Sequence, residues 1–149
     1  MAADLPDRAR VVVIGGGAIG LSTLYHLAEI GISDAVLLER KELTCGTTWH
    51  SAAQVRALRS SRNLTGLIKY SIELYSALEG ETGQATGWIN TGSLSIAANP
   101  ERLTHIKRQQ SLAHAFGVAA HSASAEEVKA RWPLVNAEDI IGAVWSPED

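Results

Sequence analysis

The sequence predicts an α/β fold that begins with a β-strand, an α-helix and a second, parallel strand within residues 10–40. Three observations support this prediction. The β-branched run Val11–Ile14 has the composition of a central parallel strand that is covered on both faces. Residues 18–30 carry apolar side chains at helical spacing, with Gly31 at the expected C-cap. The apolar run Ala35–Leu38 follows as the second strand.

Three glycines with the spacing Gly-x-Gly-x-x-Gly connect the first strand to the helix. Gly15 allows a tight turn, Gly17 lets a phosphate approach the backbone, and Gly20 lets the helix pack on the strand. Because unpaired N–H groups at a helix start bind anions, the pattern indicates a Rossmann-like unit that holds a pyrophosphate. Glu39 stands nineteen residues after Gly20, where an acceptor for ribose hydroxyls is expected. An acid there favours FAD or NAD over NADP.

A second stretch with candidate chemistry covers residues 43–53, where small and hydroxylated side chains dominate. We expect Gly46, Thr47 and Thr48 to begin a short helix whose N–H groups and hydroxyls face the same pyrophosphate. Cys45 is assigned a structural or incidental role, because no basic residue that would activate a thiol stands beside it.

Together these signals resemble the N-terminal region of the dimethylglycine dehydrogenase and sarcosine dehydrogenase family of flavoproteins. The likeness is carried by the glycine pattern, by Leu-Leu-Glu-Arg at 37–40, by Leu-Thr-x-Gly-Thr-Thr-Trp-His-Ser-Ala at 43–52, and by Trp-Ser-Pro-Glu-Asp at 145–149. It implies FAD as the cofactor, bound covalently through its 8α carbon to His50. The implied flavin contacts are Ala18, Ile19, Glu39, Arg40 and residues 46–54, which include Gly46, Thr47, Thr48, Trp49, His50 and Ser51.

The resemblance also implies an activity. It implies an oxidoreductase that oxidises a small N-methylated amino acid, of the dimethylglycine or sarcosine type, by hydride transfer to the flavin. The resulting iminium either hydrolyses or passes its one-carbon unit to folate bound by a downstream domain, and no residue of this chain is assigned as catalytic. The glycine pattern and Glu39 alone also allow an NAD-dependent dehydrogenase module, or a non-catalytic fragment that binds a dinucleotide or a partner.

Beyond residue 54 the pattern predicts three helices and the start of a substrate-side β-sheet. The helices are expected at residues 63–82, at 99–116 with a proline near the start, and at 124–131 with a capping box. Residues 88–97 predict a strand, a turn at 90–93 and a second strand, and residues 140–145 predict another strand. We interpret Arg56, Arg59 and Arg62 as a solvated face.

Composition limits the partners and the compartment. A net charge of −3 gives no electrostatic reason to expect nucleic acid or a membrane as a partner. His105 and His114 lie nine residues apart, which is not a ligand spacing, so no metal site is expected. The single cysteine and an acidic start at residues 1–7 without a basic presequence predict a cytoplasmic location. We expect residues 1–149 to be the incomplete N-terminal part of one FAD-dependent oxidoreductase domain.

Overall fold

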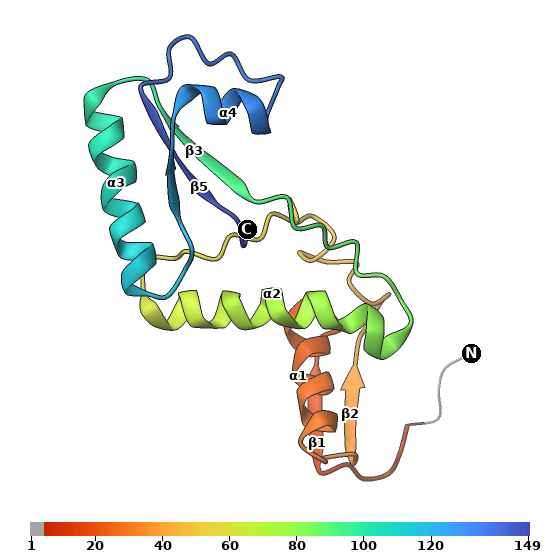
Figure 1. Ribbon diagram of the computed structural model, residues 1–149. Coiled ribbons are helices and arrows are strands. Elements are labelled where there is room, and N and C mark those ends of the chain that lie inside the picture. The colour runs from red at the N-terminus through yellow and green to blue at the C-terminus, as the bar shows by residue number, and fades with distance from the viewer. Residues whose placement is uncertain (1–4) are drawn as a thin grey trace. The chain divides into compact units, whose positions relative to one another are not determined.

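The computed structural model describes residues 5–149. These described residues form two compact units, residues 5–54 and Val55–Asp149. Each unit has its own β-sheet (Figure 1). We refer to them as the first unit and the second unit. Among the described residues, no helix has the length and apolar character needed to cross a membrane.

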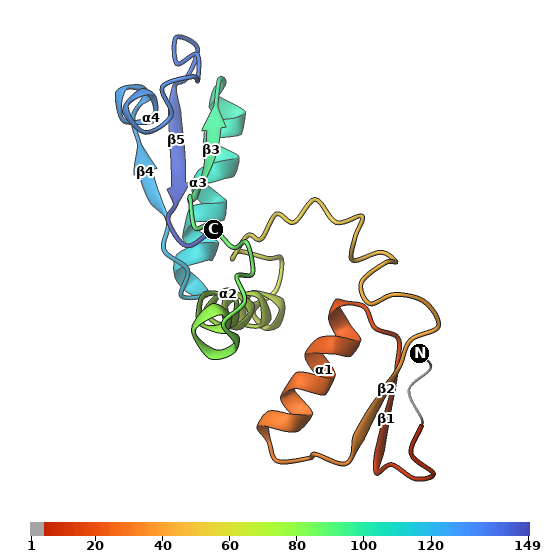
Figure 2. The same ribbon diagram turned by 90° about the vertical axis from the view of Figure 1, so that its right-hand side faces the viewer.

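The first unit is the predicted βαβ arrangement. Strand β1 (Val11–Ile14) leads through helix α1 (Ala18–Glu29) to strand β2 (Ala35–Leu38), and the two strands pair in parallel. Helix α1 packs on one face of the pair (Figure 2). Side chains along β1 alternate between half-buried and exposed, with Val12 and Ile14 exposed. The described residues therefore cover one face of β1, not the two faces that its composition predicted.

The second unit is built on a three-stranded antiparallel sheet with the order β3-β5-β4. Its core lies on both faces of the sheet, because Val144 packs with Ile106 on one face and the adjacent Ala143 packs with Val128 on the other. Ile106 belongs to α3 and Val128 to α4, so each helix covers one face (Figure 1). The elements are α2 (Arg62–Thr82), β3 (Ser93–Ala97), α3 (Pro100–Ala115), β4 (His121–Ala123), α4 (Ala125–Arg131) and β5 (Gly142–Ser146).

The helices of the second unit begin and end where local chemistry predicts. The side chain of Asn99 accepts a hydrogen bond from the Arg102 N–H at the start of α3, at 2.8 Å. Ser124 and Glu127 form both hydrogen bonds of a capping box at the start of α4. Helix α2 ends at Gly83, whose φ of 73° is left-handed. These three helices confirm the periodicity and the cap signals in the sequence.

One strand prediction was wrong, and one strand was missed. Residues 88–92 form no strand before β3; Gly87 and Gly92 take φ values of 73° and 70°, which interrupt extended backbone. The ring of Trp88 instead lies 6.4 Å from that of Tyr75. Strand β4 was not predicted, because its His-Ser-Ala sequence has no β-branched residue and its conformation depends on pairing with β5.

The arginines after residue 54 are not simply solvated. Arg56 Nε lies 3.5 Å from the buried carboxylate of Asp149, which also accepts the Ala57 N–H at 2.6 Å. Arg62 donates to the Ala115 carbonyl at 2.8 Å and lies over the ring of Phe116. Both arginines are exposed, as the solvated interpretation predicted, but each also has a partner distant in sequence, which a local charge pattern does not reveal.

Candidate cofactor site

The glycine loop has the geometry that its spacing predicted. Gly15 has a φ of 105°, a conformation that side chains disfavour, and its N–H donates to the Leu38 carbonyl at 2.8 Å. A Cβ on Gly20 would overlap the carbonyl oxygen of Gly15, so only glycine lets α1 approach the turn this closely. Gly17 is the N-cap of α1 and has no side chain to cap the helix start, so an anion can approach it; one N–H there, that of Ala18, is already bonded to the Thr48 hydroxyl.

Glu39 lies against this loop from the end of β2. One carboxylate oxygen accepts the Gly16 N–H at 2.7 Å, and the other accepts the Lys41 N–H at 2.9 Å. These hydrogen bonds stabilise the ionised carboxylate and hold the pKa of Glu39 below its ordinary value, and the bond from Gly16 has the largest effect. The carboxylate is thus ionised at neutral pH, and each oxygen keeps a lone pair for a further donor such as a ribose hydroxyl.

The stretch that follows β2 forms consecutive turns instead of the expected short helix. The N–H of His50 donates to the Thr47 carbonyl, and that of Ser51 to the Thr48 carbonyl, both at 3.2 Å and both three residues apart. Residues 46–51 thus lack the bonds four residues apart that define an α-helix. The prediction of a helix at residues 46–48 was therefore wrong.

Two hydrogen bonds attach these turns to the glycine loop. The Thr44 N–H donates to the Gly16 carbonyl at 2.8 Å. The Thr48 hydroxyl accepts the N–H of Ala18, the first residue of α1, at 2.9 Å. The two stretches that the sequence singled out are thus joined in one place, although they lie about thirty residues apart.

An open cleft of about 630 Å³ lies between the glycine loop and the turns, a size usual for cofactor sites. Ten predicted site residues line it, and three, Arg40, Trp49 and His50, do not. The lining also contains five residues that the sequence did not indicate, because apolar or small side chains carry no local signal for binding. The predicted lining residues are Gly15, Gly17, Ala18, Ile19, Gly20, Glu39, Gly46, Thr47, Thr48 and Ser51, and the additional ones are Val13, Ile14, Thr23, Thr44 and Cys45.

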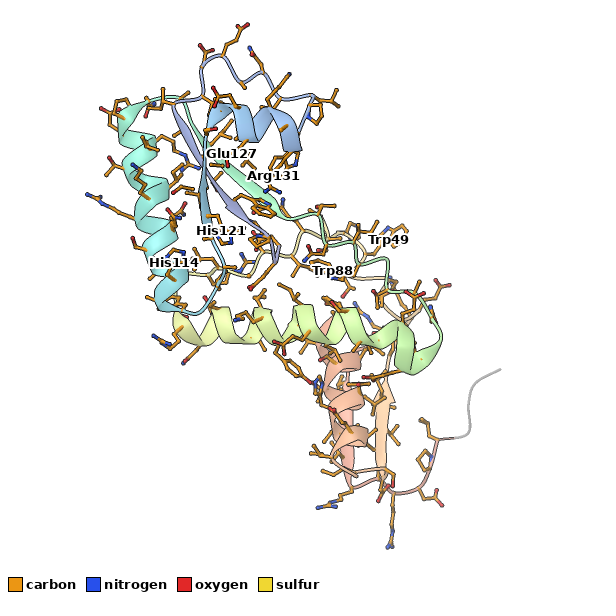
Figure 3. The ribbon with its side chains drawn as sticks, in the orientation of Figure 1. Trp49, Trp88, His114, His121, Glu127 and Arg131 are labelled. Carbon is orange, nitrogen blue, oxygen red and sulfur yellow. The ribbon has the colours of Figure 1, made fainter. Side chains whose placement is uncertain are left out.

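His50 and Trp49 are exposed side chains beside the cleft lining. The indole of Trp49 is 78% exposed (Figure 3). The His50 Nδ1 lies 2.9 Å from the Gly46 carbonyl oxygen. Because a carbonyl only accepts hydrogen bonds, Nδ1 carries the proton, and in the neutral ring Nε2 keeps its lone pair. The arrangement thus leaves Nε2 as the nucleophilic nitrogen.

Ala53 is one of two non-glycine residues with left-handed backbone in the described part of the chain, with a φ of 53°. Glycine adopts this conformation without strain, so alanine is the less favourable residue at this position.

Comparison with known proteins identifies the family. The profile of the DAO family, described as FAD dependent oxidoreductase, matches residues 10–149. The chain belongs to this family. It is 49% identical to human sarcosine dehydrogenase over 97% of this chain and 16% of the enzyme, and 39% identical to rat dimethylglycine dehydrogenase over 96% of this chain and 17% of the enzyme. The structure of L-proline dehydrogenase from P. horikoshii is also similar, with a TM-score of 0.86 and 29% identity over 97% of this chain and 38% of that one.

Membership of an FAD-dependent family decides between two of the predicted alternatives. The glycine loop and Glu39 alone allowed either FAD or NAD, and the family match favours FAD. The resemblance to sarcosine and dimethylglycine dehydrogenases is confirmed. The chain spans about a sixth of the length of these curated relatives.

The predicted cytoplasmic location was wrong. The similar human and rat enzymes are mitochondrial. The acidic start at residues 1–7 therefore does not indicate the compartment. Residues 1–4, on which that prediction partly rested, lie outside the described residues.

Proposed function

We propose that the full-length protein is an FAD-dependent oxidoreductase that oxidises a small N-methylated amino acid, of the sarcosine or dimethylglycine type. The cleft lined by the glycine loop, Glu39 and the turns at residues 44–51 carries this proposal, because it unites the groups that a dinucleotide requires. The identity to sarcosine and dimethylglycine dehydrogenases supports the substrate class. Folate, bound by a further domain, is proposed as the acceptor of the one-carbon unit.

The residues of the cleft fit the parts of FAD. The open N-terminus of α1 at Gly17 suits the pyrophosphate, and the ionised Glu39 suits the ribose hydroxyls. The exposed side chains of Ile14 and Ile19 offer apolar contact area. Bound FAD supplies the hydride acceptor for the N-methyl carbon, and the protein supplies orientation and electrostatics.

We further propose that His50 is the point of covalent attachment. The Gly46 carbonyl holds the proton on Nδ1, so that Nε2 has the free lone pair that a bond to the 8α carbon requires. In forming this bond the 8α carbon would lose a proton, and the flavin ring would take up the electron pair as reduced flavin, which the electron acceptor of the enzyme would then reoxidise. Gly46 itself lines the cleft, which keeps this hydrogen bond close to the cofactor. His50 is then a tether that also withdraws electron density from the flavin, not a general base.

Titration of the full-length apoprotein with FAD tests the cleft. Glu39→Ala removes the ribose acceptor and is expected to weaken FAD binding about tenfold or more. Glu42→Ala, an exposed acid three residues later, is the matched control and should bind like the parent. Equal affinity in all three proteins would make Glu39 a structural residue, and a parent that binds no flavin would favour a non-catalytic interaction fragment.

Anaerobic addition of sarcosine or dimethylglycine to the FAD-loaded protein tests the substrate class. Loss of the oxidised flavin absorbance is expected with at least one of these amines. Failure of both to reduce the flavin, while another amine does so, would contradict the proposed substrate.

Acid denaturation followed by a denaturing gel tests the covalent bond. Flavin fluorescence should migrate with the parent protein and with His105→Ala, an exposed histidine that serves as the control. It should be absent from His50→Ala. If the parent releases all of its flavin into the supernatant, the attachment is wrong, and a noncovalent flavoprotein is still consistent with the cleft.

A further inference from the structure

Thr44 has a backbone conformation that its side chain disfavours. Its φ of 64° is left-handed, where a β-branched residue is a conformational outlier. Such a residue is strained and occurs mainly where function requires it. Thr44 also lines the cleft, whereas Ala53, the other left-handed residue that is not glycine in the described chain, does not.

The backbone of Thr44 does not explain why this residue is threonine. Its N–H donates to the Gly16 carbonyl at 2.8 Å, and its carbonyl accepts the Trp49 N–H at 3.1 Å. These two bonds hold the turns against the glycine loop, and they use main-chain atoms alone. Glycine or asparagine would make the same bonds with less strain.

The side chain of Thr44 has a polar group without a protein partner. The residue is half-buried, and its hydroxyl makes no hydrogen bond with another residue in the described part of the chain. The hydroxyl of Thr48, four residues later, accepts the Ala18 N–H at 2.9 Å. A hydroxyl that lines a cleft, has no protein partner and is held on strained backbone is available to hydrogen-bond a ligand in that cleft.

We propose that Thr44 is a cofactor-binding residue whose hydroxyl donates a hydrogen bond to an oxygen of the ribose–pyrophosphate part of FAD. This inference rests on the proposed function, in which FAD occupies this cleft. Thr44 is bonded to Gly16, and Gly16 lies between Glu39, its hydrogen-bond partner, and the helix start at Gly17. Thr44 therefore stands beside the groups proposed for ribose and pyrophosphate.

The proposal predicts that substitutions of Thr44 change the stability of the apoprotein and its affinity for FAD independently. Replacing threonine by glycine relieves the backbone strain but removes the hydroxyl. Serine keeps the hydroxyl without β-branching, and valine keeps β-branching without the hydroxyl. A purely structural residue would lose ligand affinity only when the apoprotein lost stability.

The experiment uses the full-length protein with His50→Ala, so that ligand binding is reversible. Thermal unfolding of the apoprotein and titration with FAD and with ADP-ribose, which has no flavin ring, are measured for each variant. Thr44→Val and Thr44→Gly should weaken both ligands about tenfold, the usual effect of losing one hydrogen bond to a charged group. Thr44→Ser should bind like the parent, and the midpoint of unfolding should not fall for Thr44→Gly or Thr44→Ser.

The outcomes separate this inference from the proposed function. If Thr44→Val and Thr44→Gly bind both ligands like the parent while Glu39→Ala binds them weakly, Thr44 acts through its backbone alone and the inference is wrong. A loss for FAD but not for ADP-ribose would overturn the contact with ribose–pyrophosphate. An affinity loss that follows a fall in the unfolding midpoint would also overturn it. If the parent binds neither ligand, the proposed function itself fails.

Discussion

The first unit and the second unit differ in how they treat their apolar side chains. All buried hydrophobic side chains in the described residues belong to the second unit, where they pack on both faces of its sheet. In the first unit, Ile14 and Ile19 are 85% and 86% exposed, and both line the cleft. The first unit is held instead by the parallel pairing of β1 with β2 and by the hydrogen bonds of its glycine loop.

This difference assigns different sources of stability to the two units. The second unit gains its stability from burial of its own side chains. A ligand that binds only the folded state stabilises the structure that it contacts. We therefore expect FAD to stabilise the first unit strongly and the second unit little, and the predictions below act on one unit at a time.

The largest expected effect is that of Gly20→Ala in the first unit. The new Cβ would overlap the Gly15 carbonyl oxygen, and because that oxygen is backbone, the turn itself must move. After purification, the full-length Gly20→Ala variant should contain no flavin, which its absorbance spectrum will show. Gly80→Ala, in α2 with open space around its Cβ, is the control and should retain the flavin. Normal flavin content in Gly20→Ala would show that the close approach is not needed.

Ile106→Ala should have a smaller effect, confined to the second unit. Ile106 is fully buried in the core between α3 and the sheet. Its truncation should reduce the free energy of unfolding by about 2–5 kcal/mol, measured by urea denaturation. The dissociation constant for FAD should stay that of the parent. A matching loss of flavin affinity would mean that the two units are not energetically separate.

The smallest expected effect is a shift in the pH dependence of FAD binding. The N–H groups of Gly16 and Lys41 lower the pKa of Glu39, so its ionised form persists below the ordinary range of a glutamate. The contribution of ionised Glu39 to FAD binding is complete above the ordinary pKa of a glutamate. It is lost as the pH falls through the lowered pKa of Glu39 in the folded protein. FAD titrations of the parent should show a decline only in that acidic range, and Glu39→Gln should lack this decline. A parent decline that begins near neutral pH would contradict the assignment to Glu39.

The sequence predicted the elements whose signals are local. The glycine spacing and the two apolar runs predicted the βαβ unit, and the caps at Asn99 and Ser124 predicted two helix starts. Strand β4 was missed because its extended conformation depends on pairing with β5, which is distant in sequence. The partnership of Arg56 with Asp149 was missed for the same reason.

In the candidate cofactor site, too, the sequence predicted the features that have local signals and missed those that depend on the folded backbone. The cleft contains most residues that the motifs and the resemblance indicated, because both loops are defined by residue type and spacing. Thr44 was not indicated, since a left-handed φ at a threonine has no signature in composition. The hydrogen bond from His50 to Gly46 was also unpredicted, because ring orientation depends on the turns that replaced the expected helix.

Hydrogen exchange of the full-length protein, with and without FAD, tests the account most directly. It predicts that FAD slows exchange at residues 15–20 and 44–51, the two segments that supply most of the cleft lining, and in α1. Exchange in the core formed by α3 and β5 should change little, because its burial involves no cofactor. Strong protection of that core by FAD, with no change at residues 15–20 and 44–51, would contradict the placement of the cofactor in this cleft.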